Sequence, residues 1–277
     1  MSRLAVKREK RFENNMSSSH TEERERLHWD VVSNDYLEHR PGYPGQFFEL
    51  LHHLGVGLPQ QDILDLGAGT GALAVPFAKR GARVTAVDLS EGQLQAGREA
   101  ARRNGVEIEF KVAPAEETNL PSHSFDVITA SMCWGYFDVD RMALEVPRLL
   151  RANGLLLLAS LVWIGQEDDI ARETDKLIFK YNPRFQEQGR GGRSKIVPEW
   201  SKGRFSLKSY HEYKVDLPFN RESWRGRMRA TKWIGAALPA PQLEAFDREH
   251  TNLLDQIAPE NFKIRHQIRI QILEPEN

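Results

Sequence analysis

A strand, a glycine-rich turn and a helix start follow one another in "ILDLGAGTGALAVPFAKRGARVTAVDLS", which runs from Ile63 to Ser90. The apolar run before Gly67 predicts one buried strand, and the run ending in Asp88 predicts a second. Glycine tolerates positive φ and lets a ligand approach the backbone without a Cβ in the way. Because helix starts and strand ends of parallel sheets bind polar ligands, this stretch predicts an α/β fold with a ligand between the glycines and Asp88.

The rest of the chain continues the pattern, since short apolar runs alternate with longer amphipathic segments, as in a parallel sheet with crossover helices. Seven strands are predicted, at Asp62–Leu66, Arg83–Asp88, Ile108–Ala113, Phe125–Ser131, Leu155–Trp163, Ser209–Leu217 and Phe262–Leu273. The last run alternates apolar with charged or polar residues. Such alternation indicates a half-exposed strand near an edge of the sheet.

Helices are predicted between the strands, at Ala72–Arg80, Glu91–Asn104 and Asp138–Arg151. Gly105 is expected to end the second helix, and Pro147 should kink or divide the third. A basic disordered tail over residues 1–21 and a helix around Glu22–Arg40 precede the first strand. We expect a single domain from residue 22 to 277 with two cap insertions, 166–204 and a helical pair over 221–257 that is broken at Leu238–Pro241.

The composition narrows the class of partner. A formal net charge of −1 provides no general attraction for nucleic acid or anionic lipid. The single cysteine, Cys133, excludes an internal disulfide or a cysteine-built metal cluster. No apolar stretch approaches the roughly 20 residues of a membrane helix. We therefore expect a cytoplasmic monomer or homodimer that acts on a small molecule, with no metal, nucleic-acid or membrane partner.

Two acidic residues beside the glycines suggest the kind of ligand. Asp88 suits a ribose diol, and the glycine spacing also fits a dinucleotide fold, so a nicotinamide-dependent oxidoreductase is an alternative. Asp65 would repel a pyrophosphate but could accept hydrogen bonds from an ammonium group, which favours a cationic, amino-bearing ligand. Glu116, after the third strand, could contact an adenine edge. A protein that binds such a ligand without catalysing a reaction is a further alternative.

Four motifs occur in order, "ILDLGAGTG", "VDLS", "APAEETNLPSHSFDVITAS" and "RLLRANGLLLLAS", and they resemble those of the class I S-adenosylmethionine-dependent methyltransferases. The similarity covers nearly all of Tyr36–Leu273 and is closest to the small-molecule branch, methyltransferase type 11, with the ubiquinone-biosynthesis and trans-aconitate enzymes. It implies a Rossmann-like doubly wound seven-stranded sheet with an antiparallel last strand and a helical cap. It also implies in-line transfer of a methyl group from S-adenosylmethionine to a carboxylate or other oxygen, nitrogen or sulfur acceptor.

The resemblance assigns cofactor contacts residue by residue. The methionine part would lie beside the turn residues and the acid before them, namely Asp65, Gly67, Ala68, Gly69 and Gly71. Asp88 would hold the ribose, Leu89 would pack on adenine, and Ala115 with Glu116 would flank the polar edge of the base. Ser131 and Met132 would border the methyl donor.

Roles toward the acceptor are also expected. Tyr36 and Tyr136 would be positioning groups, and "YLEHRPGYP", Tyr36–Pro44, resembles a segment that closes over the cofactor and would bring Arg40 and Tyr43 to the substrate. Trp134 is interpreted as a substrate wall or as a core aromatic residue. Arg225 or Arg229 would pair with a substrate carboxylate unless their helix face is merely solvated. "CWGYFD" lacks a histidine that many relatives have there, so a general base is not assigned.

Overall fold

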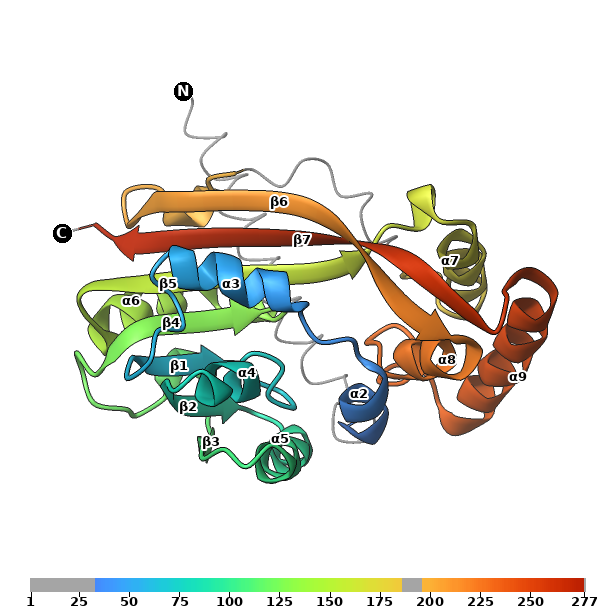
Figure 1. Ribbon diagram of the computed structural model, residues 1–277, viewed down its shortest axis with the longest axis horizontal. Coiled ribbons are helices and arrows are strands. Elements are labelled where there is room, and N and C mark those ends of the chain that lie inside the picture. Colours follow the sequence, from blue (N-terminus) through green and yellow to red (C-terminus); the bar gives the residue numbers. More distant parts are fainter. Residues whose placement is uncertain (1–32, 186–195, 277) are drawn as a thin grey trace, which may run out of the picture.

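The computed structural model describes residues 33–185 and 196–276, which contain a seven-stranded sheet with helices on both faces (Figure 1). The strands are β1 (Asp62–Leu66), β2 (Arg83–Asp88), β3 (Glu109–Val112), β4 (Phe125–Ser131), β5 (Leu150–Trp163), β6 (Phe205–Asn220) and β7 (Asn261–Pro275), in the order β3-β2-β1-β4-β5-β7-β6. Strands β1 to β5 are parallel, and β7 is antiparallel to both of its neighbours. This confirms the predicted Rossmann-like doubly wound α/β fold with an antiparallel last strand.

Strands β1, β2 and β4 have the predicted bounds, whereas β5, β6 and β7 are longer. Strand β7 lies near the edge of the sheet, as predicted, with β6 as the edge strand on its outer side. Its alternation arises from burial of one face only: Ile264, Ile268 and Ile270 are inaccessible to solvent, while Lys263 and Arg265 are exposed. The alternating pattern thus indicated a half-exposed strand correctly.

The helices are α2 (Ser33–His39), α3 (Gly45–His53), α4 (Ala74–Lys79), α5 (Glu91–Arg103), α6 (Val139–Leu149), α7 (Asp169–Tyr181), α8 (Arg221–Arg229) and α9 (Ala240–Ile257). Helix α3 was not predicted separately. Gly105 follows α5 with φ of 65°, as a left-handed C-terminal residue should. Pro147 does not divide α6, which was one of the two predicted outcomes. The helix ends two residues later, so the backbone N–H that proline lacks is missing only from the last turn.

Two apolar clusters cover the two faces of the sheet. Helices α3 and α4 pack on one face, where Phe47, Leu51 and Phe77 join the side chains of Ile63 and Val127. Helix α6 packs on the other face, where Met142, Val146 and Leu149 join Leu64 and Ile128. Alternating side chains of β1 and β4 thus enter both clusters, which is typical of a sheet buried on both sides.

Helices α7, α8 and α9 form a cap beside the far ends of β5, β6 and β7 (Figure 1). The indole Nε1 of Trp163, the last residue of β5, donates to Asp175 Oδ1 of α7 at 2.9 Å. Trp224 of α8 meets Trp163 edge-on at 5.9 Å between ring centroids and donates to Thr174 Oγ1 at 3.0 Å. Buried aromatic and hydrogen-bonded contacts therefore fix the cap on the sheet.

The predicted cap insertions correspond only partly to these helices. The first contains α7, and its residues 186–195 lie outside the described residues, as do the predicted tail at 1–21 and residues 22–32 of the predicted first helix. The second contains α8 and α9, but the break between them begins at Ala230, well before Leu238. A turn held by Thr231, whose Oγ1 donates to Met228 O at 2.7 Å, ends α8 early.

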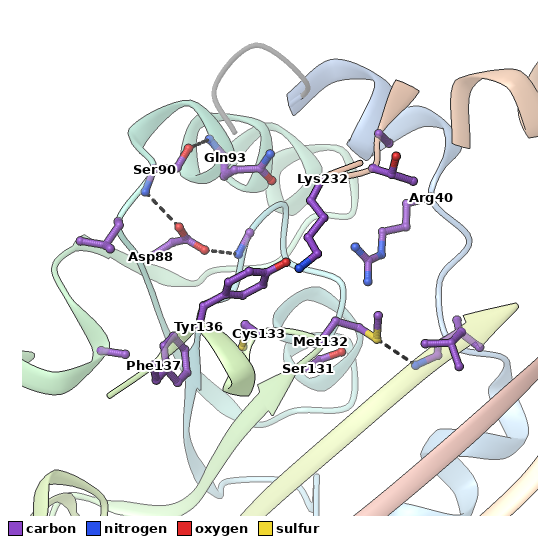
Figure 2. Close-up of a pocket in the computed structure, with 18 of the residues that line it drawn as sticks. Arg40, Asp88, Ser90, Gln93, Ser131, Met132, Cys133, Tyr136, Phe137 and Lys232 are labelled. Carbon is purple, nitrogen blue, oxygen red and sulfur yellow. Dashed lines mark hydrogen bonds between the residues drawn. The ribbon is translucent and has the colours of Figure 1, made fainter. Parts of the chain in front are cut away.

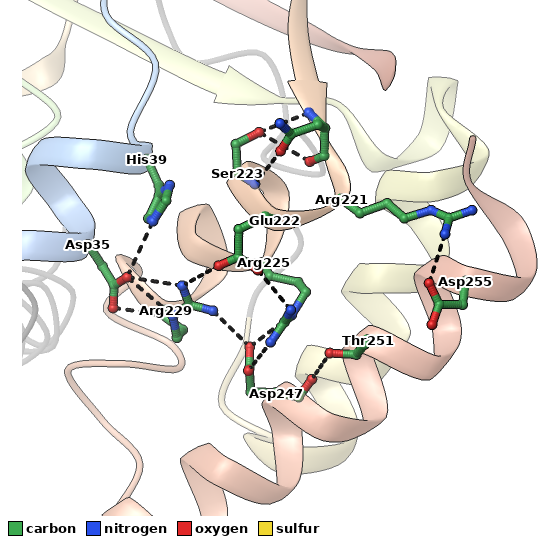
Figure 3. A network of polar contacts seen from close by, with 11 residues as sticks. Asp35, His39, Arg221, Glu222, Ser223, Arg225, Arg229, Asp247, Thr251 and Asp255 are labelled. Carbon is green, nitrogen blue, oxygen red and sulfur yellow. Dashed lines mark hydrogen bonds and ion pairs between the residues drawn. The ribbon is translucent and has the colours of Figure 1, made fainter. Parts of the chain in front are cut away.

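An ion-pair network joins α2 to the cap (Figure 3). Arg229 of α8 contacts Asp35 of α2 at 3.2 Å, Glu222 at 3.1 Å and Asp247 of α9 at 3.0 Å. Arg225 pairs with the same Asp247. The helices are also so close that a Cβ at Gly226 would overlap the ring of His39. Arg229 is therefore the cation on which three helices converge.

Replacing Arg229 by methionine should lower the free energy of unfolding by about 1–3 kcal/mol, because three carboxylates lose a shared, half-buried cation. Chemical denaturation followed by circular dichroism measures this change. Arg248→Met is the matched control, since Arg248 is an exposed α9 residue whose contact with Glu244 is 3.9 Å long. We expect this control to change stability by less than about 0.5 kcal/mol. Equal losses in both variants would contradict the role given to Arg229.

Candidate functional site

A cavity of about 340 Å³ lies beyond the carboxyl ends of β1, β2 and β4, between the sheet and the cap (Figure 2). Its volume falls within the range of small-molecule sites. The strand order reverses beside β1, so this is the crevice where open α/β sheets bind ligands. The sequence-predicted residues that line it are Arg40, Gly67, Gly69, Asp88, Leu89, Ala115, Ser131, Met132 and Tyr136.

Asp88 ties the glycine turn to the second strand (Figure 2). Its Oδ2 accepts a hydrogen bond from Gly69 N and its Oδ1 accepts one from Ser90 N, both at 2.9 Å. The N-cap of α5 is Ser90, whose side chain accepts from Gln93 N, so Asp88 is not needed for capping. A carboxylate at the end of the second strand is the residue type that suits the hydroxyls of a ribose, and this role of Asp88 stays a prediction.

The three glycines of the turn all have positive φ, at 62° for Gly67, 55° for Gly69 and 85° for Gly71. A Cβ at Gly67 would lie 2.7 Å from Cys133 Sγ, so a side chain there would displace a wall of the cavity. Gly71 does not line the cavity; its amide donates to Ala68 O at 2.9 Å. Gly67 and Gly69 therefore shape the cavity, whereas Gly71 closes the turn behind it.

Asp65 lies behind the turn in a second, smaller cavity of about 20 Å³, which Tyr43, Ala68 and Ser131 also line. That volume is enough for one water molecule. Asp65 is buried and accepts a hydrogen bond from Thr129 Oγ1 at 2.6 Å. Burial raises the pKa of its carboxyl group to about 7. Asp65 is thus adjacent to the main cavity without lining it.

The segment after α2 lies against the end of β4. Tyr43 Oη and Ser131 Oγ are 2.8 Å apart, and Arg40 lines both cavities. The segment Tyr36–Pro44, which was predicted to close over the cofactor, therefore contacts the end of β4 at Ser131. Tyr36 belongs to α2, but its side chain lies outside the described residues, and its positioning role stays a prediction.

Met132 has a left-handed backbone, with φ of 63°, which is rare for a residue with a side chain. Its amide donates to Ala159 O at 3.0 Å, and its Sδ accepts from Leu161 N at 3.2 Å (Figure 2). Both contacts reach β5, so the chain turns sharply after β4 and presents Met132 to the cavity. Strained backbone of this kind concentrates at functional sites.

Besides Gly71, four predicted contacts in the described part of the chain line neither cavity, namely Glu116, Trp134, Arg225 and Arg229. Glu116 Oε1 accepts from Asp138 N at 2.9 Å, so one oxygen of this carboxylate supports the start of α6, and its contact with a base stays a prediction. Trp134 packs on Trp200, with ring centroids 4.9 Å apart. Arg225 and Arg229 are engaged by Asp247 and its neighbours (Figure 3).

Sequence reasoning missed Arg227, Lys232 and the two tryptophans that line the cavity beside them. The guanidinium carbon of Arg227 lies 5.0 Å from the centroid of the Trp163 ring. Lys232 Nζ lies 4.3 Å from the Trp233 ring and 5.0 Å from the Tyr136 ring. Arg227 follows Trp224 by three residues and precedes Thr231 by four. This helical spacing could have indicated that Arg227 lies on the buried face of α8.

No histidine is among the described residues that line the cavity. His250 is buried in the cap, where burial lowers its pKa to about 3, and its Nε2 lies 3.2 Å from Thr174 Oγ1. His211 contacts Ser209 within β6. Cys133 donates to Leu66 O at 3.2 Å, and burial raises the pKa of its thiol, which keeps it neutral. The described residues hold no cluster of three metal-ligating side chains.

Residues 64–158 match the family model described as the methyltransferase domain. This matched region, about a third of the chain, forms a class I methyltransferase domain. A ubiquinone/menaquinone biosynthesis C-methyltransferase from Vibrio parahaemolyticus is 37% identical over 106 residues, 36% of this chain and 41% of the relative. The nocamycin O-methyltransferase of Saccharothrix syringae is 37% identical over 101 residues, 35% of this chain and 36% of the relative. This chain thus spans less than half the length of either relative.

Solved structures support the same fold. A candidate type II methyltransferase from Anaeromyxobacter dehalogenans has a TM-score of 0.58 and 23% identity, covering 84% of this chain and 96% of that one. A methyltransferase from Geobacter sulfurreducens, solved with S-adenosylhomocysteine, has a TM-score of 0.50 and 16% identity, covering 89% and 96%. S-adenosylmethionine is the cofactor of the methyltransferase domain, and Asp88, which lines the cavity beside Gly69, is of the residue type that suits its ribose. None of the described helices is long and apolar enough to cross a membrane.

Replacing Gly67 by alanine should abolish measurable binding of S-adenosylhomocysteine, because the new Cβ would displace Cys133 from the cavity wall. Calorimetric titration measures the binding. Gly105→Ala is the matched control: its φ of 65° imposes the same backbone strain, but no atom lies within 4 Å of the new Cβ. Both variants should lose about 1–2 kcal/mol of stability from that strain. Undiminished binding by the Gly67 variant would contradict this account of the turn.

The buried carboxyl of Asp65 predicts a pH effect on stability. Its pKa of about 7 in the folded chain exceeds the ordinary value of 3.8, so its contribution is fully present below the ordinary value and is lost as pH rises toward 7. Asn cannot ionise, so Asp65→Asn should gain stability relative to the wild type between pH 5 and pH 8. Urea denaturation at both pH values measures the difference. Asp169→Asn, an exposed α7 position, is the control, and a pH-independent Asp65 difference would refute the prediction.

Proposed function

We propose that this protein transfers a methyl group from S-adenosylmethionine to a small organic molecule. The observation that carries the proposal is the Asp88 carboxylate, oriented by the amides of Gly69 and Ser90 at the mouth of a cavity of about 340 Å³. Two relatives are named for methylation in quinone biosynthesis and of nocamycin, which supports a small acceptor. We further propose a cytoplasmic monomer or homodimer with no nucleic-acid partner, in keeping with the net charge of −1.

The cavity offers different surroundings at its two ends. Gly67, Gly69 and Asp88 would hold the methionine and ribose parts, while Leu89, half exposed, would pack on the base. Ser131 and Met132 would border the reacting carbon. When bound, the cofactor supplies a methyl group that is already activated by the positive sulfur.

The reaction then needs alignment more than chemical assistance. The residues that line the cavity would hold the acceptor atom in line with the carbon–sulfur bond of the bound cofactor, so that a new bond to the methyl carbon could form as that bond breaks and its electron pair stays on a neutral sulfur. Alignment of two reactants can contribute about 7–11 kcal/mol to lowering the barrier. The cap and the segment from Arg40 to Pro44 would supply it by enclosing the acceptor and excluding water.

Replacing Asp88 by asparagine should weaken binding of S-adenosylhomocysteine at least about tenfold, because a charged acceptor of the ribose hydroxyls becomes a neutral one. Calorimetric titration measures the affinity. Glu91→Gln is the matched control, since Glu91 is an exposed acid three residues after Asp88 in the chain and pairs with Arg98 at 2.7 Å. The control should bind like the wild type. Absence of binding in the wild type would overturn the proposed function.

Transfer itself is tested with a radiolabelled methyl donor and fractionated metabolite extracts. Appearance of labelled product that requires the wild-type protein supports the proposal. If S-adenosylhomocysteine binds but no fraction yields labelled product, the chain is a cofactor-binding homologue without transfer activity.

A further inference from the structure

We propose that Tyr136 accepts a proton from the substrate during methyl transfer and that Lys232 is a positioning residue that acts through Tyr136. The acceptor atom would then arrive with its proton still attached. This inference rests on the proposed function and assigns a catalytic residue in the same cavity. It is carried by the position of the Lys232 ammonium beside the Tyr136 side chain.

Few side chains of the cavity could take up a proton. Apart from two arginines, four ionisable residues line it in the described part of the chain, namely Asp88, Cys133, Tyr136 and Lys232. Asp88 is engaged by two backbone amides at the proposed ribose end. The Cys133 thiol donates to Leu66 O, and burial raises its pKa, so it stays neutral. Charged lysine and arginine are donors only, which leaves the oxygen of Tyr136 as the candidate base.

The backbone places Tyr136 close to the end of β4. It is the last residue of a single helical turn, η3 (Trp134–Tyr136), and its amide donates to Cys133 O at 2.9 Å. This turn directly follows Met132, which is proposed to border the reacting carbon. Figure 2 shows the Tyr136 hydroxyl in the cavity, pointing away from Asp88 and toward Lys232. Its oxygen is therefore presented to the space where an acceptor would lie.

Lys232 reaches the same space from the cap. Its Nζ lies 5.0 Å from the centroid of the Tyr136 ring and 4.3 Å from that of the Trp233 ring, and Figure 2 shows its amino end beside the Tyr136 hydroxyl. The backbone next to it is anchored to the end of α7, because Trp233 O accepts from Asn182 Nδ2 at 2.8 Å. Lys232 and Tyr136 thus meet across the cavity from two separately fixed elements.

A neighbouring ammonium stabilises the ionised form of a phenol by Coulomb attraction. Among the other charged groups that line the described cavity, Arg40 and Arg227 act in the same direction and Asp88 acts against it. The attraction falls with distance, and Lys232 is the cation that lies next to the Tyr136 ring. We therefore expect Lys232 to determine how readily Tyr136 ionises.

Ionised Tyr136 can assist transfer to an atom that holds a proton at neutral pH, such as the oxygen of an alcohol or phenol. Its oxygen would take that proton while the acceptor atom forms its bond to the methyl carbon and the carbon–sulfur bond breaks with its electron pair on sulfur. Tyr136 is then a neutral phenol beside the Lys232 ammonium. Loss of its proton to solvent restores the starting state, so no further reactant is required.

The first test needs neither an acceptor nor the cofactor, because ionised and neutral tyrosine differ in ultraviolet absorption. The ligand-free protein is titrated with base beside its Tyr136→Phe variant, and the difference between the two curves reports Tyr136 alone. The same pair of titrations in a Lys232→Met background should show Tyr136 ionising at higher pH, because the neighbouring cation is lost. Lys232→Arg keeps the cation and should resemble the wild type.

Lys176→Met is the matched control for this shift. Lys176 is an exposed lysine of α7 that pairs with Glu173 at 2.8 Å and is not among the residues that line the described cavity. It should leave the ionisation of Tyr136 unchanged. Ionisation at the same pH in the wild type and in Lys232→Met would overturn the proposal.

The second test measures transfer from radiolabelled S-adenosylmethionine to the extract fraction that the wild type labels. Tyr136→Phe should lower the maximal rate about 100-fold, as loss of a general base does, and should leave the half-saturating concentration similar. Lys232→Met should be slow at neutral pH and recover as pH rises, because Tyr136 then ionises without the lysine. Tyr210→Phe is the control and should keep the wild-type rate, since the Tyr210 hydroxyl donates to Glu212 on the exposed face of β6.

Three kinetic results would also overturn the proposal. One is an unchanged maximal rate for Tyr136→Phe. Another is release of the label as methanol in mild alkali, which marks a methyl ester and hence a carboxylate acceptor that arrives without a proton. The third is a loss of S-adenosylhomocysteine affinity in Tyr136→Phe that accounts for its whole loss of rate.

The comparison of Lys232→Met with Lys232→Arg decides the question if Tyr136→Phe does not fold, since only the former should need a higher pH for full activity. Failure of the wild type to bind S-adenosylhomocysteine instead contradicts the proposed function. The titration of Tyr136 in the ligand-free protein still measures its coupling to Lys232 in that case.

Discussion

The carboxylate of Asp88 connects two consecutive crossover units of the sheet, because it accepts one hydrogen bond from the turn after β1 and one from the start of α5. These bonds hold the amide of Gly69 in a left-handed turn that other residues would resist. On one side of the turn Gly67 and Gly69 line the cavity, and on the other side the hydrogen bond from Gly71 N to Ala68 O closes the turn. The remaining site residues are placed relative to this arrangement by β4, by β5 and by the cap.

The central part of the fold could be predicted from the sequence because its signals are local. Strands β1, β2 and β4 are short apolar runs bounded by turn residues, and the structure has them where the pattern placed them. The outer strands are longer than predicted partly because some of their added residues, such as Ser206 and Asn261, are exposed and polar, and only pairing with a neighbour makes them strands. Pairing is not visible in a single sequence.

The candidate site divides in the same way. Gly67, Gly69, Asp88 and Met132 lie in motifs of fixed spacing, and they line the cavity. The residues at the other end of the cavity were harder to predict from the sequence, because the rotation of α8 about its axis decides which of its arginines line the cavity. Spacing four residues apart drew attention to Arg225 and Arg229, which form ion pairs on the outer face, while Arg227 lies on the face of Trp224 and Met228. The ion pairs of the cap explain the difference: Asp247 and Asp35 hold the outer arginines.

The contact between Asp35 and Arg229 links two walls of the cavity. Helix α2 leads directly to Arg40, and α8 carries Arg227, so the ion pair fastens together two segments that line the same space. Moving these segments apart requires the separation of opposite charges that are partly shielded from water. Dissolved salt weakens such attractions, so the width of the cavity between the two segments should depend on the ionic strength of the medium.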